Sequence, residues 1–208
     1  MRTLVIETAT EALSVALFEG EEVAEWRHRI IGRGHAESLL PLIAELPGKG
    51  EAERILVSLG PGSFTGTRIG IATARALGLA WGAKVLGYPT LSLVATSFRA
   101  EHGEMPLLVV MTGGHGEWFL QSFAADGRAL DELQSLPPEA ASAGFTCDAV
   151  TGSQAEAFVQ QRGFGRAYEL LPDARWASRL PCESLHATIA PIYGRPPDAR
   201  PAVPGLSA

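Results

Sequence analysis

The sequence predicts an α/β protein with a mixed sheet, and two observations lead to this prediction. Two apolar runs, at 4–6 and 12–18, and a partly alternating segment at 23–30 are separated by polar turns, which indicates two consecutive hairpins. Helical and strand patterns then alternate up to residue 100, which is typical of parallel strands covered by helices. Together they place antiparallel strands at the edge of an otherwise parallel sheet. This order is characteristic of ribonuclease H-like domains.

The alternating elements follow from start and stop signals in the chain. A helix is expected over 35–46, because a glycine-rich break precedes it and a Pro-Gly pair ends it. A buried strand at 55–59 runs directly into a glycine turn and a second helix over 64–81. A strand at 84–87 and a helix from Pro89 to about residue 100 complete this part of the chain.

A polar stretch near residues 101–105 predicts a boundary between two lobes. We expect an N-terminal ribonuclease H-like lobe over 1–102 and a smaller C-terminal lobe over 103–195. The proline-rich residues 196–208 cannot continue a helix and are expected to form an extended tail. The elements expected in the second lobe are a hairpin of strands at 107–111 and 118–123, a strand near 148–151, and helices near 153–161 and 173–180.

Composition and charge narrow the class of function. Hydrophobic residues make up 46% of the chain and charged residues 19%, which is typical of a folded domain with a sizeable core. The net charge of −6 disfavours autonomous binding to nucleic acid or to an anionic membrane. Cys147 and Cys182 are too few for a disulfide scaffold. Because no signal peptide or membrane span is recognised, a cytoplasmic protein is expected.

The turn Gly60–Gly66 lies between a strand and a helix, where backbone amides can bind a phosphate. A Walker A loop needs Gly-Lys-Ser/Thr, whereas Thr67 and Arg68 follow the last glycine here. A dinucleotide site needs an acidic residue at the end of the next strand, which instead ends in Leu-Gly-Tyr. Two interpretations remain: a tight turn in which Pro61 fixes φ, and a loop that holds an anion.

Small residues recur at every fourth position of the second helix. Gly66, Gly70, Ala74 and Gly78 form a smooth face, although each glycine costs about 1 kcal/mol relative to alanine. Such a face indicates that another backbone comes close, either the sheet of this chain or a helix of another subunit. The leucine-rich first helix favours the second, since its apolar residues surround more of its circumference than one sheet face can cover. The expected partner interface comprises His35, Leu39, Leu42, Ile43, Leu46, Gly66, Arg68, Ile69, Gly70, Thr73, Ala74, Leu77 and Gly78.

Four segments resemble the TsaB (YeaZ) family. They are 4–17, 35–43, the stretch from Gly60 to Ala74, and Pro191–Ala199, which carries the family's closing Pro-x-Tyr-x-Arg motif. The likeness is strongest over 1–95. It implies a two-lobed fold of the actin-like ATPase class. It also implies a role in installing the threonylcarbamoyl group on adenosine 37 of tRNAs that read codons starting with A.

The resemblance also implies partners. TsaD transfers the group to tRNA and binds TsaB through the two helices, which form a helical bundle with it. A TsaC-type enzyme makes threonylcarbamoyl-adenylate, and TsaE joins the assembly with ATP or ADP. TsaB activates TsaD as a non-catalytic scaffold, so no catalytic residue, metal or cofactor is expected in this chain. The family also implies homodimers through the same surface and only indirect contact with tRNA.

The chain departs from the family pattern at several positions. Glu7 stands where the family has Asp, and the metal-holding histidines of TsaD align with Thr90 and Val94, which are poor ligands. Residues 112–116 replace an Asp-Ala-Arg motif and resemble the Ser-Gly-Gly-His loop by which TsaD contacts phosphate, so they form either a hairpin turn or an anion nest. The alternative function is an actin-class ATPase, or a glycoprotease-like peptidase, acting on its own. The candidate anion- or nucleotide-binding residues are Glu7, Gly60, Gly62, Ser63, Thr65, Thr112, Gly113 and Gly114.

Overall fold

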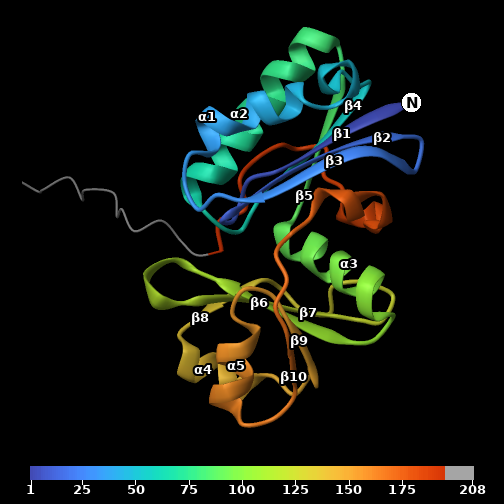
Figure 1. The fold of residues 1–208 in the computed structure, drawn as a ribbon. Coiled ribbons are helices and arrows are strands. Elements are labelled where there is room, and N and C mark those ends of the chain that lie inside the picture. The colour runs from blue at the N-terminus through green and yellow to red at the C-terminus, as the bar shows by residue number, and fades with distance from the viewer. Residues whose placement is uncertain (195–208) are drawn as a thin grey trace, which may run out of the picture.

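The computed structural model describes residues 1–194, which form two lobes around a central helix (Figure 1). The layers follow one another in the order α1 with α2, the first sheet, α3 with the 3-10 helix η3, the second sheet, and α4 with α5. This arrangement confirms the predicted α/β class and the two-lobed, actin-like layout. Within residues 1–194, no helix is both long and apolar enough to cross a membrane.

The first sheet has the strand order β3-β2-β1-β4-β5. Its central strand β1 (Arg2–Glu7) pairs antiparallel with β2 (Ala12–Glu19) and parallel with β4 (Arg54–Ser58). The edges are β3 (Glu22–Ile30) and β5 (Lys84–Tyr88). Both predicted hairpins and the mixed sheet with antiparallel strands at one edge are therefore confirmed. Residues of β1 and β2 are buried on both faces, because helical layers cover the sheet on each side.

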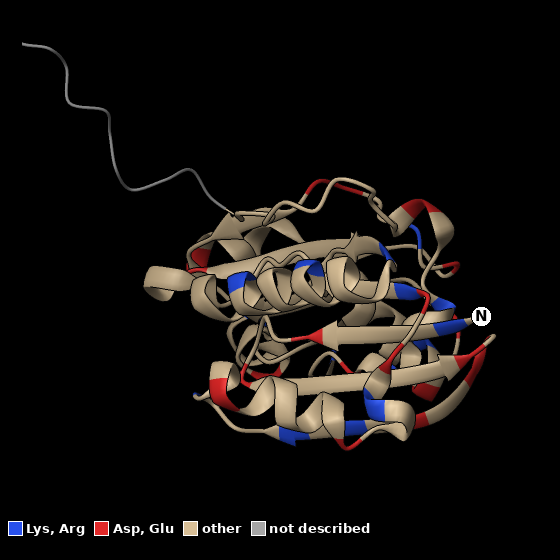
Figure 2. Cartoon of the chain, turned by 90° about the horizontal axis from the view of Figure 1, so that it is seen from above, with Lys and Arg blue, Asp and Glu red and all other residues tan. Residues whose placement is uncertain are grey.

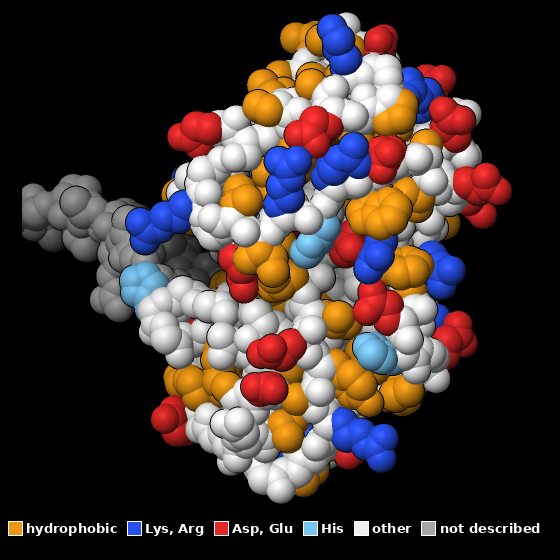
Figure 3. Space-filling model, viewed as in Figure 1, with side chains coloured by type: hydrophobic (Ala, Val, Ile, Leu, Met, Phe, Trp, Pro, Cys, Tyr) orange, Lys and Arg blue, Asp and Glu red, His pale blue; other side chains and the backbone are white. Residues whose placement is uncertain are grey.

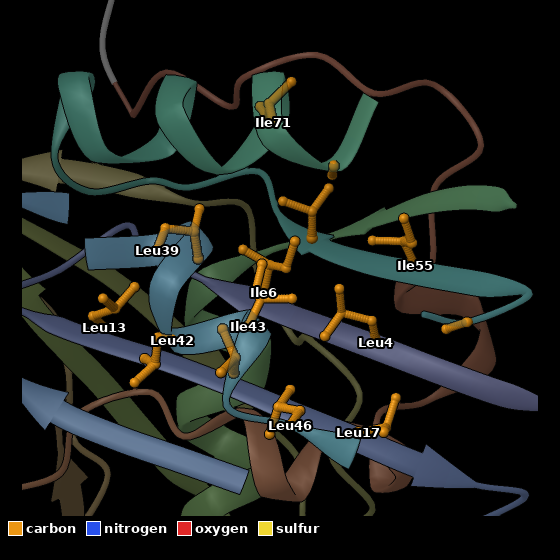
Figure 4. Close-up of a cluster of buried hydrophobic side chains, with 14 of the residues drawn as sticks. Leu4, Ile6, Leu13, Leu17, Leu39, Leu42, Ile43, Leu46, Ile55 and Ile71 are labelled. Atoms are coloured by element: carbon orange, nitrogen blue, oxygen red, sulfur yellow. The ribbon is translucent and has the colours of Figure 1, made fainter. Parts of the chain in front are cut away.

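Helices α1 (His35–Ala44) and α2 (Phe64–Trp81) cover one face of this sheet, and their apolar residues share a core with β1, β2 and β4 (Figure 4). Helix α3 (Thr90–His102) lies between the two sheets. Leu93 on α3 packs into the core below the first sheet, whereas Phe98 packs with strands of the second. Because both sides of α3 are covered, all of its residues from Thr90 to Phe98 are buried, small hydroxyl side chains as well as apolar ones.

The second sheet has the order β10-β9-β6-β7-β8. The predicted hairpin of β6 and β7 is confirmed, as are the strand β9 and the helix α5. Strands β8 and β10 and helix α4 were not predicted, because they are too short to show a period. The bounds are β6 Leu107–Thr112, β7 Trp118–Phe123, β8 Gln134–Leu136, α4 Pro138–Gly144, β9 Ala149–Thr151, α5 Ala155–Arg162 and β10 Arg166–Tyr168. The 3-10 helices are η1 Pro47–Gly50, η2 Gly114–Gly116, η3 Ala174–Arg179 and η4 Cys182–Ser184.

After β10 the chain returns to the first sheet. The amide of Ala174 donates to the hydroxyl oxygen of Ser14 on β2 at 3.0 Å, and apolar residues of η3 pack below β1 and β2. The helix expected near 173–180 is thus a 3-10 helix. The expected limits of the second lobe, 103–195, include this segment, whereas its contacts are with the first sheet. The tail expected over 196–208 lies outside the described residues.

Candidate functional site

The glycine turn between β4 and α2 packs tightly against the turn between β1 and β2. The amide of Ser63 donates to the carbonyl of Ala9 at 2.6 Å, and the hydroxyl of Thr8 donates to the carbonyl of Gly66 at 2.8 Å. A Cβ atom on Gly62 or on Gly66 would overlap the carbonyl oxygen of Ala9 or of Thr8. The glycines therefore allow two turns of this chain to touch, as the tight-turn interpretation requires.

The small-residue face of α2 points toward the chain's own sheet, which corrects the expected interface. A Cβ atom on Gly70 would overlap the hydroxyl of Thr8, and one on Gly78 would lie 2.5 Å from a methyl carbon of Val85. Ala74 is fully buried in the core. The stripe thus brings α2 close to β1, β4 and β5.

The apolar residues of α1 are also turned inward. The exposed fraction is at most 7% for His35, Leu39, Leu42 and Ile43 of α1 and for Leu46, which follows the helix. The four apolar side chains of this set point into the core in Figure 4. The physical reason is that α1 packs on the sheet and on α2 together, so two neighbours cover its wide apolar arc. Of the remaining expected interface residues, Arg68 is exposed, and Ile69, Thr73 and Leu77 are half-buried.

A different surface of the same two helices is exposed and apolar, and the sequence analysis missed it. Leu79 is 88% exposed and Leu40 is 53% exposed. Helix α2 carries Arg68 and Arg75 and no acidic residue, and Figure 2 views this helical layer from above. The sequence does carry a signal for this surface, because Ala72, Ala76 and Ala80 of α2 are spaced by four residues and so share one side of the helix. We define the α1–α2 outer face as the exposed residues Ala36, Leu40, Ala44, Ala72, Ala76, Leu79 and Ala80.

A cleft of about 940 Å³ lies between the lobes and brings together two loops that the sequence singled out. Gly62 and Ser63 line it from the first lobe, and residues 112–115 line it from the second. Gly60, Thr65 and Glu7 do not line it, so part of the expected anion site is elsewhere. The other lining residues are Ala9, Thr10, Glu11, Gly32, Pro61, Phe64, Thr67, Arg68, Met111, Phe119, Ser153, Pro191, Ile192, Tyr193 and Gly194.

The glycine loop between β6 and β7 uses its first amides within the chain. The amide of Thr112 donates to the hydroxyl oxygen of Ser153 at 3.0 Å, and that of Gly113 donates to the carbonyl of Glu117 at 2.8 Å. A Cβ atom on Gly113 would lie 2.6 Å from the same carbonyl oxygen. These contacts are those of a tight hairpin turn. They favour the turn over an anion nest, since a nest needs amides that point at the ligand.

Glu7 is fully buried at the end of β1 and points inward. One carboxylate oxygen accepts from the amide of Ala9 at 2.7 Å, and the hydroxyl of Tyr88 lies 3.4 Å from the other. Burial raises the pKa of Glu7 from the ordinary 4.5 to about 7. Nearby, the hydroxyls of Ser58 and Thr90 are 2.7 Å apart. Glu7 therefore stabilises the β1–β2 turn by accepting a hydrogen bond from its backbone. Among the described residues, no group of three or more His, Cys, Asp or Glu side chains could hold a metal ion.

Comparison with known proteins shows which family the chain belongs to. Residues 29–140, more than half of the chain, match the model of the family described as TsaD, tRNA N6-adenosine threonylcarbamoyltransferase. The tRNA threonylcarbamoyladenosine biosynthesis protein TsaB of Escherichia coli (strain K12) is 31% identical over 131 residues, and that of Haemophilus influenzae is 37% identical over 103 residues. The chain belongs to the TsaD family, in its TsaB (YeaZ) branch.

The TsaB relatives are matched over part of their length. The alignments cover 61% and 47% of this chain, and 56% and 42% of the E. coli and H. influenzae proteins, so the chain spans about half of the curated relatives it matches. The structure of YeaZ from Pseudomonas aeruginosa superposes with a TM-score of 0.78 at 25% identity, covering 92% of this chain and 99% of that one. A second P. aeruginosa structure, described as similar to peptidase YEAZ, also has a TM-score of 0.78, at 26% identity and with 93% and 99% coverage. The YeaZ fold thus extends over nearly the whole chain.

Proposed function

We propose that this chain is an accessory subunit of the machinery that makes threonylcarbamoyladenosine at position 37 of tRNA, and that it binds and activates a TsaD-type transferase. The observation that carries the proposal is the α1–α2 outer face, where Leu79 and Leu40 are exposed among alanines. Small side chains let a second helix approach closely, and exposed leucines gain free energy when a partner buries them. The docking surface is therefore the outer side of the two helices.

Charge supports an indirect relation to tRNA. The chain carries a net charge of −6, and basic and acidic side chains alternate on the upper lobe in Figure 3. Arg27 and Arg29 both pair with Glu45, at 3.1 and 3.0 Å, so their charge is partly compensated. We propose that the partners contact the tRNA, because an acidic protein repels the phosphate backbone.

The family also suggests the further components of the assembly. We propose that TsaE and a TsaC-type enzyme complete the machinery, that ATP or ADP binds in the complex with TsaD and TsaE, and that the chain requires no cofactor of its own. The isolated chain would cover its outer face by forming a homodimer. A TsaD-type partner would then compete with that homodimer for one surface. Such an assembly acts in the cytoplasm, where tRNA is modified.

Co-elution in size-exclusion chromatography with the purified TsaD-type transferase of the same organism tests the proposal. The wild-type chain should move into the complex peak. Ala76→Glu, which puts a charge on the outer face, should leave both proteins in separate peaks, because a buried unpaired charge is costly. Ala157→Glu on the exposed side of α5 is the matched control and should still co-elute. Co-elution of Ala76→Glu would contradict the assignment of the surface.

The second candidate function is a nucleotide-binding enzyme, and the observation in its favour is the cleft between the lobes. Three observations weigh against it: two loop amides are engaged within the chain, Glu7 accepts from the amide of Ala9, and the hydroxyl of Thr90 is paired with Ser58. The peptidase version needs an activated nucleophile, whereas the Ser63 hydroxyl caps α2 by accepting from Gly66 at 3.1 Å. Calorimetric titration with Mg²⁺ and ATP should give no heat of binding. Submillimolar binding would favour the enzyme.

A further inference from the structure

The last described segment, residues 186–194, crosses from the edge of the first sheet to the second lobe. Its first anchor is on β5, where Gly87 and His186 exchange two backbone hydrogen bonds of 2.8 Å. Arg75 of α2 then donates to the carbonyl of Ile189, and the amide of Ile192 donates to the carbonyl of Leu59 at 2.7 Å. Ile189 and Ile192 also pack against the core of the first lobe. We call this segment the C-terminal strap.

The end of the strap meets an aromatic and arginine cluster at the start of α2. Arg68 donates to the hydroxyl of Tyr193 at 2.8 Å, and its guanidinium carbon lies 3.3 Å from the centre of the Phe64 ring. The rings of Phe64 and Tyr193 are 6.1 Å apart. Tyr193 is 53% exposed and Phe64 is 59% exposed. This cluster lies at the surface, so solvent can compete for its contacts.

The next residue of the strap touches the other lobe. A Cβ atom on Gly194 would overlap the ring of Phe119, a buried residue of β7. Gly194 therefore sits directly on the second lobe, one residue after the contact with Arg68 on the first. Residues 191–194, Arg68 and Phe119 all line the cleft between the lobes. The strap thus forms one wall of the cleft and joins its two sides.

The strength of the anchors changes along the strap. The part from His186 to Ile192 is held by backbone hydrogen bonds and by two isoleucines packed on the core. Tyr193 is held by one side-chain hydrogen bond and exposed ring contacts. A segment built in this way loosens first at its exposed end.

We propose that the C-terminal strap is a latch between the lobes, with the contact between Arg68 and Tyr193 as its catch. With the catch closed, Gly194 stays on Phe119 and the lobes are held at one separation. With the catch open, residues 193 and 194 leave the cleft wall, and the lobes can move apart on this side. The latch gives a physical role to the Pro-x-Tyr part of the closing motif, which is Pro191 to Tyr193 in this chain. It is a property of the isolated chain and does not rest on binding to a transferase.

The distance between the lobes can be measured by pulsed electron paramagnetic resonance. Spin labels are attached through Glu37→Cys on α1 and Glu139→Cys on α4, two exposed positions, in a chain that also carries Cys147→Ser and Cys182→Ser. Dilution with unlabelled protein removes distances between molecules. The chain with an intact strap should give one narrow peak. Tyr193→Ala and Arg68→Gln should each lose that peak in favour of a broader distribution at longer distances, and Tyr193→Phe, which loses only the hydroxyl, should give a mixture.

Phe164→Ala is the matched control. It removes an aromatic ring that is 50% exposed and that contacts an arginine, Arg162, at 3.9 Å, but lies in the second lobe away from the strap. It should keep the narrow peak. Circular dichroism should show the same secondary structure in the variants at Arg68, Tyr193 and Phe164 as in the labelled parent chain, since these three side chains are exposed. A narrow peak that is unchanged in both Tyr193→Ala and Arg68→Gln would overturn the latch.

Discussion

The hydroxyl of Thr8 occupies the space that a Cβ atom on Gly70 would need. This relationship links the end of β1 to the middle of α2 and fixes how closely the helix lies on the sheet. It also decides the meaning of the small-residue stripe, because a face that is already filled from inside the chain is not free for a partner. Helix α2 therefore has an inner side that packs within the chain and an outer side that is exposed.

Gly70→Ala should destabilise the protein by about 1–3 kcal/mol, because the added methyl group overpacks the contact with Thr8. Helix propensity alone predicts the opposite sign, a gain of about 1 kcal/mol. Urea unfolding measures the difference. Gly144→Ala is the control, since a Cβ atom there meets nothing within 4 Å, and its stability should change little. A stabilised Gly70→Ala variant would mean that α2 lies farther from β1 than described.

Ser63→Ala should lower the free energy of unfolding by about 1 kcal/mol, because it removes the side-chain acceptor for the amide of Gly66. The neighbouring exposed substitution Thr65→Ala serves as the control and should cost less. Thermal unfolding of both variants, side by side, checks the prediction. Equal losses would argue against a capping role for Ser63.

Glu7 should make the stability depend on pH. Its pKa is about 7 in the folded protein and near 4.5 when exposed, so the folded state binds the proton more tightly. The contribution of this group is fully present below about pH 4.5 and is lost as the pH rises through 7. The difference corresponds to roughly 3 kcal/mol. Stability should therefore decline between pH 5 and pH 8.

Glu7→Gln keeps an oxygen acceptor for the amide of Ala9 but cannot ionise. Its stability relative to the wild type should rise by up to roughly 3 kcal/mol between pH 5 and pH 8. Glu156→Gln, at an exposed position on α5, should show no such trend. Parallel pH profiles for the wild type and Glu7→Gln would show that Glu7 ionises normally in the folded protein.

The first lobe could be predicted from the sequence because its elements are long and well marked. The apolar runs of β1 and β2, and the capped and glycine-terminated helix α2, leave little choice of structure. In the second lobe, β8 and β10 have three residues each, and their pairing depends on neighbours that are distant in the chain. Such short strands carry no readable period.

The candidate site was predicted only in outline. Periodicity showed that the backbone of α2 meets another backbone, but it could not say which, because a sheet of the same chain and a helix of a partner need the same small residues. The leucines of α1 were wrongly expected to face a partner. They are covered within the chain by two neighbours, the first sheet and α2. The loops at Gly62 and Gly113 face one cleft, but their hydrogen bonds within the chain become visible only in three dimensions.

The central claim is that the outer face of α1 and α2, and not the buried glycine stripe, binds a TsaD-type transferase. Isothermal titration of the purified transferase with the wild type, Ala76→Glu and Ala157→Glu tests it most directly. Ala76→Glu should weaken the affinity by roughly tenfold or more, with an unchanged melting temperature, because the new charge lies on the face that the partner would bury. Ala157→Glu should bind like the wild type. Equal dissociation constants for the wild type and Ala76→Glu would contradict the account.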